Sequence, residues 1–336
     1  MTTGPLIGLR VIEMAGLGPC PFAAMMLADM GAEVVRIERK TDPAAPNPYP
    51  TLGTKYDVMA RGRRSLALDL KDPQARAVLL GLVDKADALV EGFRPGVMAK
   101  LGLGWDQLHA ANPKLVVCAI TGYGQRSAWS HRAGHDINYI AMAGVLEQIA
   151  TADGELAVPN FQIGDLMGGT QAAVSGVLAA LLAAQRTGVG RLVDISMSHE
   201  VLRHHVLAAF TLQASGRTPV PGRDLLSGGA PCYAVYRTAD GRHLAVGALE
   251  LKFWQALCGA VGRPEWADQH WTLGLVVGSP ASMALRGELA ALLANQPLEH
   301  WAAVFEPVDA CVTPVLRLDE TLRHPVFYPS GLSTNP

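Results

Sequence analysis

The chain has 336 residues, of which 49% are hydrophobic and 17% are charged, and its formal net charge is −2. The high apolar content excludes a mainly disordered chain. The charged fraction is below the roughly 25% of ordinary soluble proteins, which indicates a large buried core and a large buried interface. The nearly balanced charge gives no electrostatic basis for nucleic-acid binding, so we expect no nucleic-acid partner.

Targeting signals are not evident in the sequence. The first residues, MTTGPLIGLRVIEM, lack the basic head, apolar core and cleavage site of a signal peptide. Five cysteines lie far apart without a C-x-x-C pair, which is typical of a reducing compartment, so we expect a cytoplasmic protein. Residues 166–185 carry no formal charge over the length of a membrane span. Their glycines, glutamines and closely spaced alanines and leucines favour a helix buried inside the protein, and we expect no membrane association.

The first 120 residues alternate between short apolar runs and helical patterns. Asp72-Pro73 is a favourable helix start, with aspartate as the N-cap and proline at the first helical position. Strands that alternate with helices predict a parallel sheet with right-handed crossovers. Strands are expected at 9–14, 34–37, 65–70, 88–90 and 115–120, and helices at 21–30, 72–82 and 96–101.

Beyond residue 130 helical patterns dominate from about 137 to 214, interrupted by an expected strand at 191–195. A hairpin is expected from 233 to 246, turned at Ala239-Asp240-Gly241, with helices following to about 305. The polar, Gly/Pro-rich segment 215–231 predicts a domain boundary. We therefore expect a large domain at 1–215, a smaller domain at 216–325 and a tail at 326–336.

The first strand–helix turn carries part of a dinucleotide-binding pattern. Gly16 and Gly18 are followed by Glu38, at the distance where such a fold carries its ribose-binding acid. The third glycine of the pattern should stand where this chain has Pro21, and the segment after Glu38 is basic. The sequence therefore argues against NAD binding. A helix N-terminus that faces a ligand's polar group is compatible with it.

Basic residues gather beside the expected strands. Arg39 and Arg94 directly follow strands, and ligands of open α/β sheets bind outside the carboxyl ends of the strands. Guanidinium groups at that edge suit a polyphosphate, because they form charge-assisted bidentate hydrogen bonds. A solvated surface is the alternative for any single arginine. The clusters are Arg36, Arg39 and Lys40, then Arg61, Arg63 and Arg64, then Arg94.

A metal site is not expected. His204 and His205 follow His199 by five and six residues, whereas a zincin places its two imidazoles at i and i+4 on one helical face.

Three segments carry candidates for catalysis, namely one histidine and three acids. His135 and Asp136 stand between Gly134 and a long apolar stretch, and either could cap a helix or take part in chemistry. Asp165 stands alone at the mouth of the uncharged stretch, either as an N-cap or as a partly buried acid whose pKa suits catalysis. Glu250 follows an apolar strand end, where a capping carboxylate is the alternative.

Taken together, these segments resemble the class III CoA-transferase (CaiB/BaiF) superfamily, and within it the α-methylacyl-CoA racemase branch. The resemblance runs from about residue 5 to about residue 325. The motifs that carry it are GLRVIEMAGLGPCPFAAMMLADMGAEVVRIER, DVMARGRRSLALDLK, VEGFRPGVM, TGYGQ, AGHDINYIAMAGVL, GDLMGG, QRTGVGRLVDISM, GGAPCYAVYRTADGRHLAVGALE and DACVTPV.

The resemblance implies an α/β fold with a large Rossmann-like parallel-sheet domain, a smaller α+β domain, and an interlocked homodimer with the acyl-CoA site between subunits. It implies His135 and Asp165 as the acid/base pair and Glu250 as the acid that orients the histidine, a role that Asp136 could share. Transferases of the superfamily usually lack the histidine. The implied CoA-contacting positions are Arg39, Leu68, Asp69, Leu70, Lys71, Arg94, Gly134, Asn138 and Tyr139.

Such a pair suits the inversion of a carbon that bears hydrogen, because one group must remove the proton and another must deliver one to the opposite face. We therefore expect an isomerase that interconverts the C2 epimers of 2-methylacyl-CoA thioesters through an enolate, stabilised by backbone N–H donors at a helix start. The chemistry needs no metal, nicotinamide or flavin, and CoA enters as part of the substrate.

Several positions depart from the racemase pattern. Ser227 stands where these racemases usually carry aspartate, Leu251 replaces a proline after Glu250, Lys40 replaces a common proline, and the C-terminal tail looks shortened relative to the family. Two alternatives stay open. One is a CoA-transferase with Asp165 as covalent nucleophile, and the other is a non-catalytic CoA-binding protein.

Overall fold

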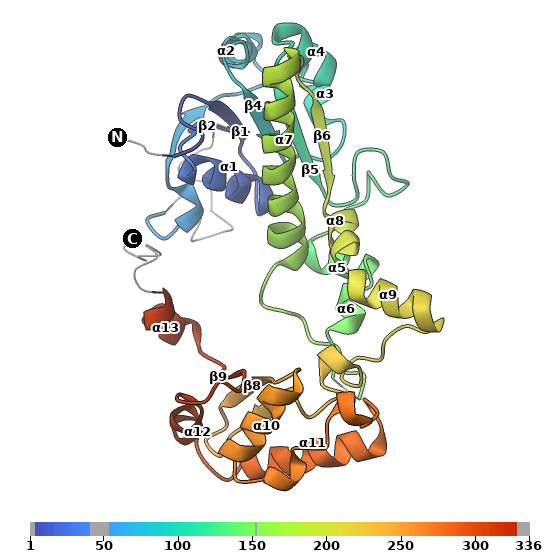
Figure 1. Ribbon diagram of the computed structural model, residues 1–336. Coiled ribbons are helices and arrows are strands. Elements are labelled where there is room, and N and C mark those ends of the chain that lie inside the picture. Colours follow the sequence, from blue (N-terminus) through green and yellow to red (C-terminus); the bar gives the residue numbers. More distant parts are fainter. Residues whose placement is uncertain (1–3, 41–53, 152, 328–336) are drawn as a thin grey trace. The chain divides into compact units, whose positions relative to one another are not determined.

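The computed structural model describes residues 4–40, 54–151 and 153–327 (Figure 1). These residues divide into two compact units. Those within Met1–Leu146 and Val158–Val206 form the first unit, and those within Glu147–Ala157 and Leu207–Asn335 form the second. Each unit has a hydrophobic core of its own.

A six-stranded parallel sheet forms the centre of the first unit, as the alternating pattern predicts. Its strand order is β3-β2-β1-β4-β5-β6, so the order reverses between β1 and β4. In open α/β sheets this reversal opens a crevice at the carboxyl ends of the strands, where ligands bind. The strands are β1 (Arg10–Met14), β2 (Glu33–Glu38), β3 (Arg63–Ala67), β4 (Ala88–Glu91), β5 (Val116–Thr121) and β6 (Leu192–Ser196).

Helices cover both faces of this sheet, because successive strand residues point to opposite sides and the central strands are apolar on both. Val116 and Cys118 of β5 pack in the cluster that includes α1 (Pro19–Asp29) and α7 (Gln171–Thr187). Val117 packs in the cluster on the other face, with α2 (Pro73–Val83) and α4 (Trp105–Ala111). α3 (Val97–Lys100) precedes α4.

Local sequence signals account for most of these helices. The Asp72 carboxylate accepts the N–H of Gln74 at 2.8 Å, which confirms the predicted N-cap of α2. The strand predicted at 65–70 begins and ends earlier, at Arg63–Ala67. The short helix α4 was not predicted.

The chain then becomes mainly helical, with α5 (Asp136–Met142), α6 (Val145–Gln148), the π-helix η2 (Ile163–Thr170), α7, α8 (Met197–His204) and α9 (Val206–Ser215). The continuous helical stretch Ile163–Thr187 is long and apolar enough to cross a membrane by length and composition, and 44% of its window is buried inside the protein. A core helix passes the same test, and α7 contributes six buried residues to the packing against the sheet and α1.

The second unit contains a three-stranded antiparallel sheet in the order β7-β8-β9. β7 (Tyr233–Arg237) and β8 (His243–Gly247) confirm the predicted hairpin, whereas β9 (Val312–Pro314) lies in the DACVTPV motif and was not predicted as a strand. The helices of this unit are α10 (Leu251–Ala260), α11 (Pro280–Leu293), α12 (Leu298–Phe305) and α13 (Leu318–Thr321). Short 3₁₀ turns in the chain are η1 (Val58–Ala60), η3 (Leu225–Ser227), η4 (Pro264–Trp266), η5 (Trp271–Leu273) and η6 (Pro325–Phe327).

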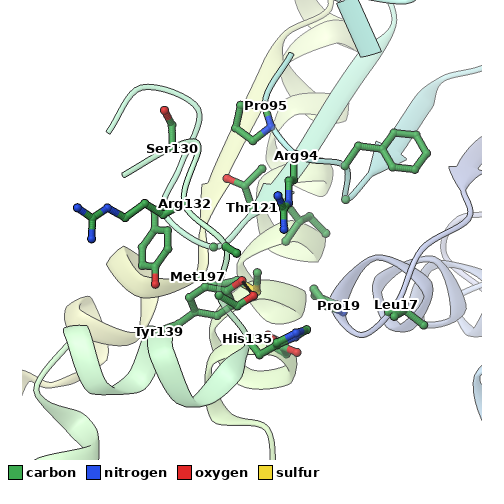
Figure 2. A pocket seen from close by; sticks show the side chains of 18 residues that line it. Leu17, Pro19, Arg94, Pro95, Thr121, Ser130, Arg132, His135, Tyr139 and Met197 are labelled. Carbon is green, nitrogen blue, oxygen red and sulfur yellow. Dashed lines mark hydrogen bonds between the residues drawn. The ribbon is translucent and has the colours of Figure 1, made fainter. Parts of the chain in front are cut away.

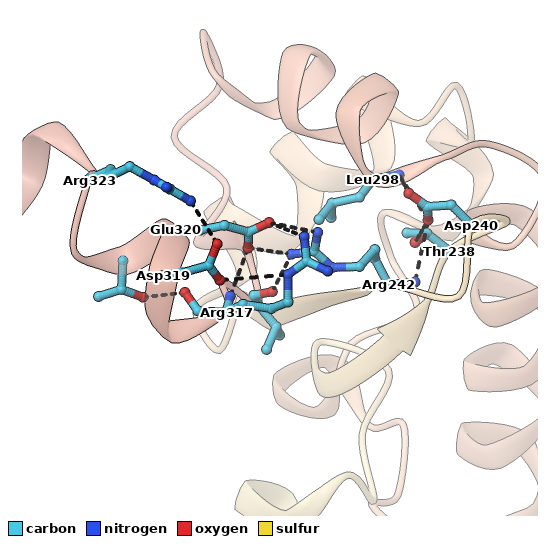
Figure 3. A network of polar contacts seen from close by, with 10 residues as sticks. Thr238, Asp240, Arg242, Leu298, Arg317, Asp319, Glu320 and Arg323 are labelled. Atoms are coloured by element: carbon cyan, nitrogen blue, oxygen red, sulfur yellow. Dashed lines mark hydrogen bonds and ion pairs between the residues drawn. The ribbon is translucent and has the colours of Figure 1, made fainter.

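A polar network joins the hairpin to the end of the second unit (Figure 3). Arg242 of the hairpin makes a bidentate ion pair with Glu320 of α13, at 3.0 and 2.7 Å. Hydrogen bonds from Arg242 and from the backbone of Arg317 lower the pKa of Glu320 to about 2. The turn residue Asp240 accepts the backbone N–H of Leu298 at 3.3 Å, which fixes the start of α12.

The division between the units falls at 206/207, close to the segment 215–231 that the sequence indicates as a boundary. Residues 147–157 belong to the second unit although they lie inside the sequence of the first. Most of the expected tail at 326–336 lies outside the described residues.

Candidate active site

A cavity of about 380 Å³ opens at the carboxyl edge of the large sheet, where the strand order reverses (Figure 2). Leu17 and Pro19 come from the loop after β1, Arg94 from the loop after β4, and Thr121 from the end of β5. His135, Tyr139 and Asp165 also line it. The cavity therefore has the position that the topology of an open α/β sheet assigns to a ligand.

His135 occupies the N-cap position of α5, with an extended backbone. Its N–H donates to Oδ1 of Asn138 at 3.0 Å, so the polar residues of the HDINY segment fix the helix start. The imidazole is exposed at the cavity. Capping and a catalytic role are thus compatible at this residue.

Asp165 is not the N-cap that the sequence left as one alternative. It lies inside the π-helix Ile163–Thr170, a local widening that is frequent at functional sites. Burial, and after it the negative charge of Asp136, raise the pKa of its carboxyl to about 6, while the charge of His135 opposes the shift. An acid with such a pKa can both give and take a proton near neutral pH.

Asp136 begins α5 beside His135. Its Oδ1 accepts the backbone N–H of Asp165 at 2.8 Å, so the two acids belong to one arrangement. The sequence suggested Asp136 as a support for the imidazole, but the hydrogen bond that the described residues show for its carboxylate goes to Asp165.

Tyr139 forms the wall behind this pair. Its hydroxyl donates to the carbonyl oxygen of Gly134 at 2.5 Å, and its ring meets Tyr123 edge to face at 5.2 Å. Burial and then the charge of Asp165 raise the pKa of Tyr139 to about 12, so the hydroxyl stays a donor. The expected Gly134 and Tyr139 contacts therefore coincide with the cavity.

The other expected CoA positions follow neighbouring strands at the same edge of the sheet. Arg39 comes directly after β2 and is exposed. Residues 68–71 follow β3, and their backbone is held by Arg76, whose guanidinium donates to the carbonyl oxygens of Leu70 and Lys71 at 3.2 and 3.0 Å. Arg94 lines the cavity itself. The residues of this group that do not line the cavity are Arg39, Leu68, Asp69, Leu70, Lys71 and Asn138.

The arginines of the three basic clusters differ in whether they form ion pairs with acidic side chains. Arg36 and Arg63 make ion pairs with the buried Glu13, and the former also pairs with Glu38. Arg61 and Arg64 pair with acids as well. Among the described residues no acid pairs with Arg39 or Arg94.

Glu250 lies in the second unit, at the N-cap position of α10, and is exposed. Its carboxylate makes no capping hydrogen bond within the described part of the chain, so side-chain capping does not account for it. Its expected role beside His135 stays a prediction.

Sequence reasoning missed several residues that line the cavity. They include Arg132, whose guanidinium stacks over the ring of Trp129 at 4.0 Å, and Met197, the first residue of α8. The loop that carries Arg132 follows β5 at the same sheet edge as the other loops of the site, and this position in the sequence could have pointed to it. Two of the three histidines in the segment without zincin spacing contact backbone: Nδ1 of His204 lies 2.7 Å from the carbonyl oxygen of Glu200, and Nδ1 of His205 lies 3.4 Å from that of Ala143. The described residues contain no group of three His, Cys, Asp or Glu able to hold a metal ion.

Comparison with known proteins covers nearly the whole chain. The model of CoA-transferase family III matches residues 6–335. The alpha-methylacyl-CoA racemase of Homo sapiens is 38% identical over 321 residues, which are 95% of this chain and 80% of the racemase. The acetyl-CoA:oxalate CoA-transferase of Acetobacter aceti is 32% identical over 327 residues, which are 96% of this chain and 83% of the transferase.

The fold has a solved counterpart in Rv3272 of Mycobacterium tuberculosis. That structure matches with a TM-score of 0.79 and 28% identity, over 97% of this chain and 88% of the other. The family match, the racemase and transferase relatives and the solved fold agree, and this chain belongs to CoA-transferase family III.

Proposed function

We propose that this chain interconverts the C2 epimers of 2-methylacyl-CoA thioesters by 1,1-proton transfer. The observation that carries the proposal is the meeting of His135 and Asp165 at one cavity on the carboxyl edge of the sheet. His135 caps α5 and Asp165 lies in the π-helix Ile163–Thr170, and each could act on a substrate carbon placed between them. The similarity to alpha-methylacyl-CoA racemases supports the same reaction class.

In the proposed reaction His135 removes the α-proton of one epimer, and Asp165 delivers a proton to the opposite face of the resulting enolate. The roles reverse for the other epimer. Because burial holds the pKa of Asp165 near 6, this acid is ionised for the most part at neutral pH yet remains a usable donor. Backbone N–H groups at the start of α5 are suitable donors for the enolate oxygen. Proton transfer of this kind needs no redox cofactor.

The CoA portion would bind along the carboxyl edge of β2, β3 and β4. Arg39 and Arg94, which form no ion pair with a described acid, would supply guanidinium groups for phosphates, and Arg76 holds the backbone of Leu70 and Lys71. Replacing Arg39 or Arg94 by glutamine should therefore raise the KM for acyl-CoA more than it lowers kcat.

The active form is proposed to be a homodimer. α9 exposes Leu207, Phe210 and Leu212, and apolar side chains of this size at neighbouring surface positions mark an interaction surface. In a dimer, Glu250 is proposed to orient the imidazole of His135.

A CoA-transferase is the second candidate, favoured by the accessible carboxylate of Asp165 and by the Acetobacter aceti relative. In that reaction the carboxylate attacks the thioester carbonyl and displaces CoA as a thiolate, which gives a mixed anhydride. The thiolate then attacks the aspartyl carbonyl, so that the acyl group leaves as a carboxylate and CoA stays on the enzyme as a thioester. Incubation with one epimer of 2-methylacyl-CoA separates the candidates. Formation of the other epimer, with no protein thioester trapped by hydroxylamine, supports the epimerase. Trapping at Asp165 with CoA transfer to an added carboxylate supports the transferase, and failure of both reactions with retained CoA binding supports a non-catalytic protein.

A further inference from the structure

The backbone N–H of Asp165 donates a hydrogen bond to a side chain of another helix. Asp165 stands near the start of the π-helix Ile163–Thr170, where N–H groups lack an acceptor in the preceding turn. Oδ1 of Asp136, on α5, accepts this N–H at 2.8 Å. The carboxylate of one acid thus holds the peptide of the other.

We propose that Asp136 is a positioning residue for Asp165, because its carboxylate fixes the Asp165 backbone at the cavity. As a second negative charge nearby, Asp136 also favours the protonated form of Asp165. The inference rests on the proposed proton-transfer function, in which Asp165 must both accept and donate a proton. It gives Asp136 a partner different from the imidazole of His135.

The close approach of the two helices depends on a residue without a side chain. A Cβ on Gly164 would lie 3.2 Å from Oδ1 of Asp136 and 3.3 Å from Cβ of Tyr139. On the other side of Asp165, its Oδ2 faces α1, because a Cβ on Gly18 would lie 3.1 Å from it. Asp165 is therefore confined between α1 and α5.

Few charges face Asp165 from the elements that pack against the π-helix. Asp136 and His135 on α5 have opposite effects on its pKa, and the charge of Asp165 in turn acts on Tyr139. At the glycines Gly168 and Gly169 of the π-helix, α1 presents Pro19 and α8 presents Met197 and Val201, which are uncharged. Asp136 is thus the negative charge that acts on Asp165 at this site.

Two variants of Asp136 separate the effect of its hydrogen bond from the effect of its negative charge. Asp136→Asn keeps an oxygen acceptor for the N–H and removes the charge, whereas Asp136→Ala removes both. Asp106→Asn, an exposed acid at the start of α4, is the matched control. Circular dichroism checks that each variant is folded, and the near-isosteric asparagine variant keeps the test open should the alanine variant unfold.

The first readout is the titration of Asp165 itself, followed by NMR of ¹³C-labelled aspartate carboxyls and assigned by the signal that Asp165→Asn removes. We expect a pKa of about 6 in the parent and in the control, and a lower value in both Asp136 variants that stays above 3.8, because burial is the larger cause of the shift. An unchanged Asp165 titration in both variants would overturn the proposal, whatever the substrate is.

The second readout is kinetic. The acidic limb of the pH profile of kcat/KM should move to lower pH in Asp136→Asn. In Asp136→Ala, kcat should fall by roughly 10–100-fold with KM within about twofold, since small misplacements of a reacting group have effects of this size. Parent-level kcat and an unmoved acidic limb in both variants would contradict the positioning role. A parent enzyme without epimerase activity would refute the proposed function, while the NMR titration would still decide the role of Asp136.

Discussion

The wall of the cavity behind Asp165 depends on a glycine in the loop after β5. A Cβ on Gly122 would lie 2.2 Å from Cε1, 2.5 Å from Cζ and 2.7 Å from the hydroxyl oxygen of Tyr139. Carbon atoms in contact are normally about 3.5–4.0 Å apart, so Gly122→Ala would displace the ring by more than about 1 Å. Because Tyr139 is buried and hydrogen-bonded to the carbonyl oxygen of Gly134, there is little room for this movement.

The expected loss can be estimated from two contributions. Overpacking a well-packed position costs about 1–3 kcal/mol. Loss of the hydrogen bond from the Tyr139 hydroxyl adds about 0.5–1.5 kcal/mol. The free energy of unfolding of the first unit should therefore fall by roughly 2–4 kcal/mol, which corresponds to a decrease in Tm of roughly 5–15 °C for a domain of this size.

Thermal and urea unfolding of Gly122→Ala, followed by circular dichroism, tests this estimate. Gly81→Ala is the matched control, because Gly81 is exposed in α2 and a Cβ there meets nothing within 4 Å. It should leave stability unchanged or raise it by up to about 1 kcal/mol. In the double variant Gly122→Ala/Tyr139→Ala the losses should be less than additive. Equal stability of Gly122→Ala and Gly81→Ala would refute the steric argument.

Three further predictions concern charges and thiols outside the reacting pair. Burial raises the pKa of Glu91 from 4.5 to about 7, so the free energy of unfolding should fall as pH rises between these values. Glu91→Gln can still accept the N–H of Phe93, and its free energy of unfolding in urea at pH 8 should be higher by on the order of 1–3 kcal/mol. No gain at pH 8 would contradict this. Arg242 lowers the pKa of Glu320 to about 2, so the ion pair stabilises the fold fully above about pH 4.5 and this stabilisation is lost as pH falls toward 2. An acid unfolding curve of Glu320→Gln that matches that of the parent would exclude this contribution. Cys311 is exposed and the other four cysteines are buried. A thiol reagent should therefore label one cysteine in the native protein and five in urea. Rapid labelling of more than one cysteine in the native protein would contradict this packing.

Local chemistry made the parallel sheet predictable. The central strands β1, β4 and β5 are short, mainly apolar runs that are almost entirely buried. Asp72-Pro73 marks the start of α2, and the structure contains the expected capping hydrogen bond. The hairpin turn at Asp240 was visible for the same reason, since Asp-Gly favours such a turn. In contrast, β9 has three residues and gains its identity by pairing with β8, which is a tertiary effect.

The candidate site was predictable in its residues but not in their contacts. The HDINY and GDLMGG motifs pointed to His135 and Asp165. Nothing in their local sequence indicated that Asp165 lies inside a π-helix, or that its N–H is bonded to Asp136, because both depend on the packing of α5 against that helix. Arg132 was likewise missed, since its position follows from stacking on Trp129.

The most direct test of the proposed proton transfer is deuterium exchange in D₂O with the single variants His135→Ala and Asp165→Ala. Each variant is incubated separately with each C2 epimer of a 2-methylacyl-CoA, and deuterium at C2 and inversion are measured together. Two bases on opposite faces predict that each variant loses inversion and still exchanges the α-proton of one epimer only, with the opposite choice of epimer in the two variants. Exchange of the same epimer by both variants, or unimpaired inversion in either, would contradict the account.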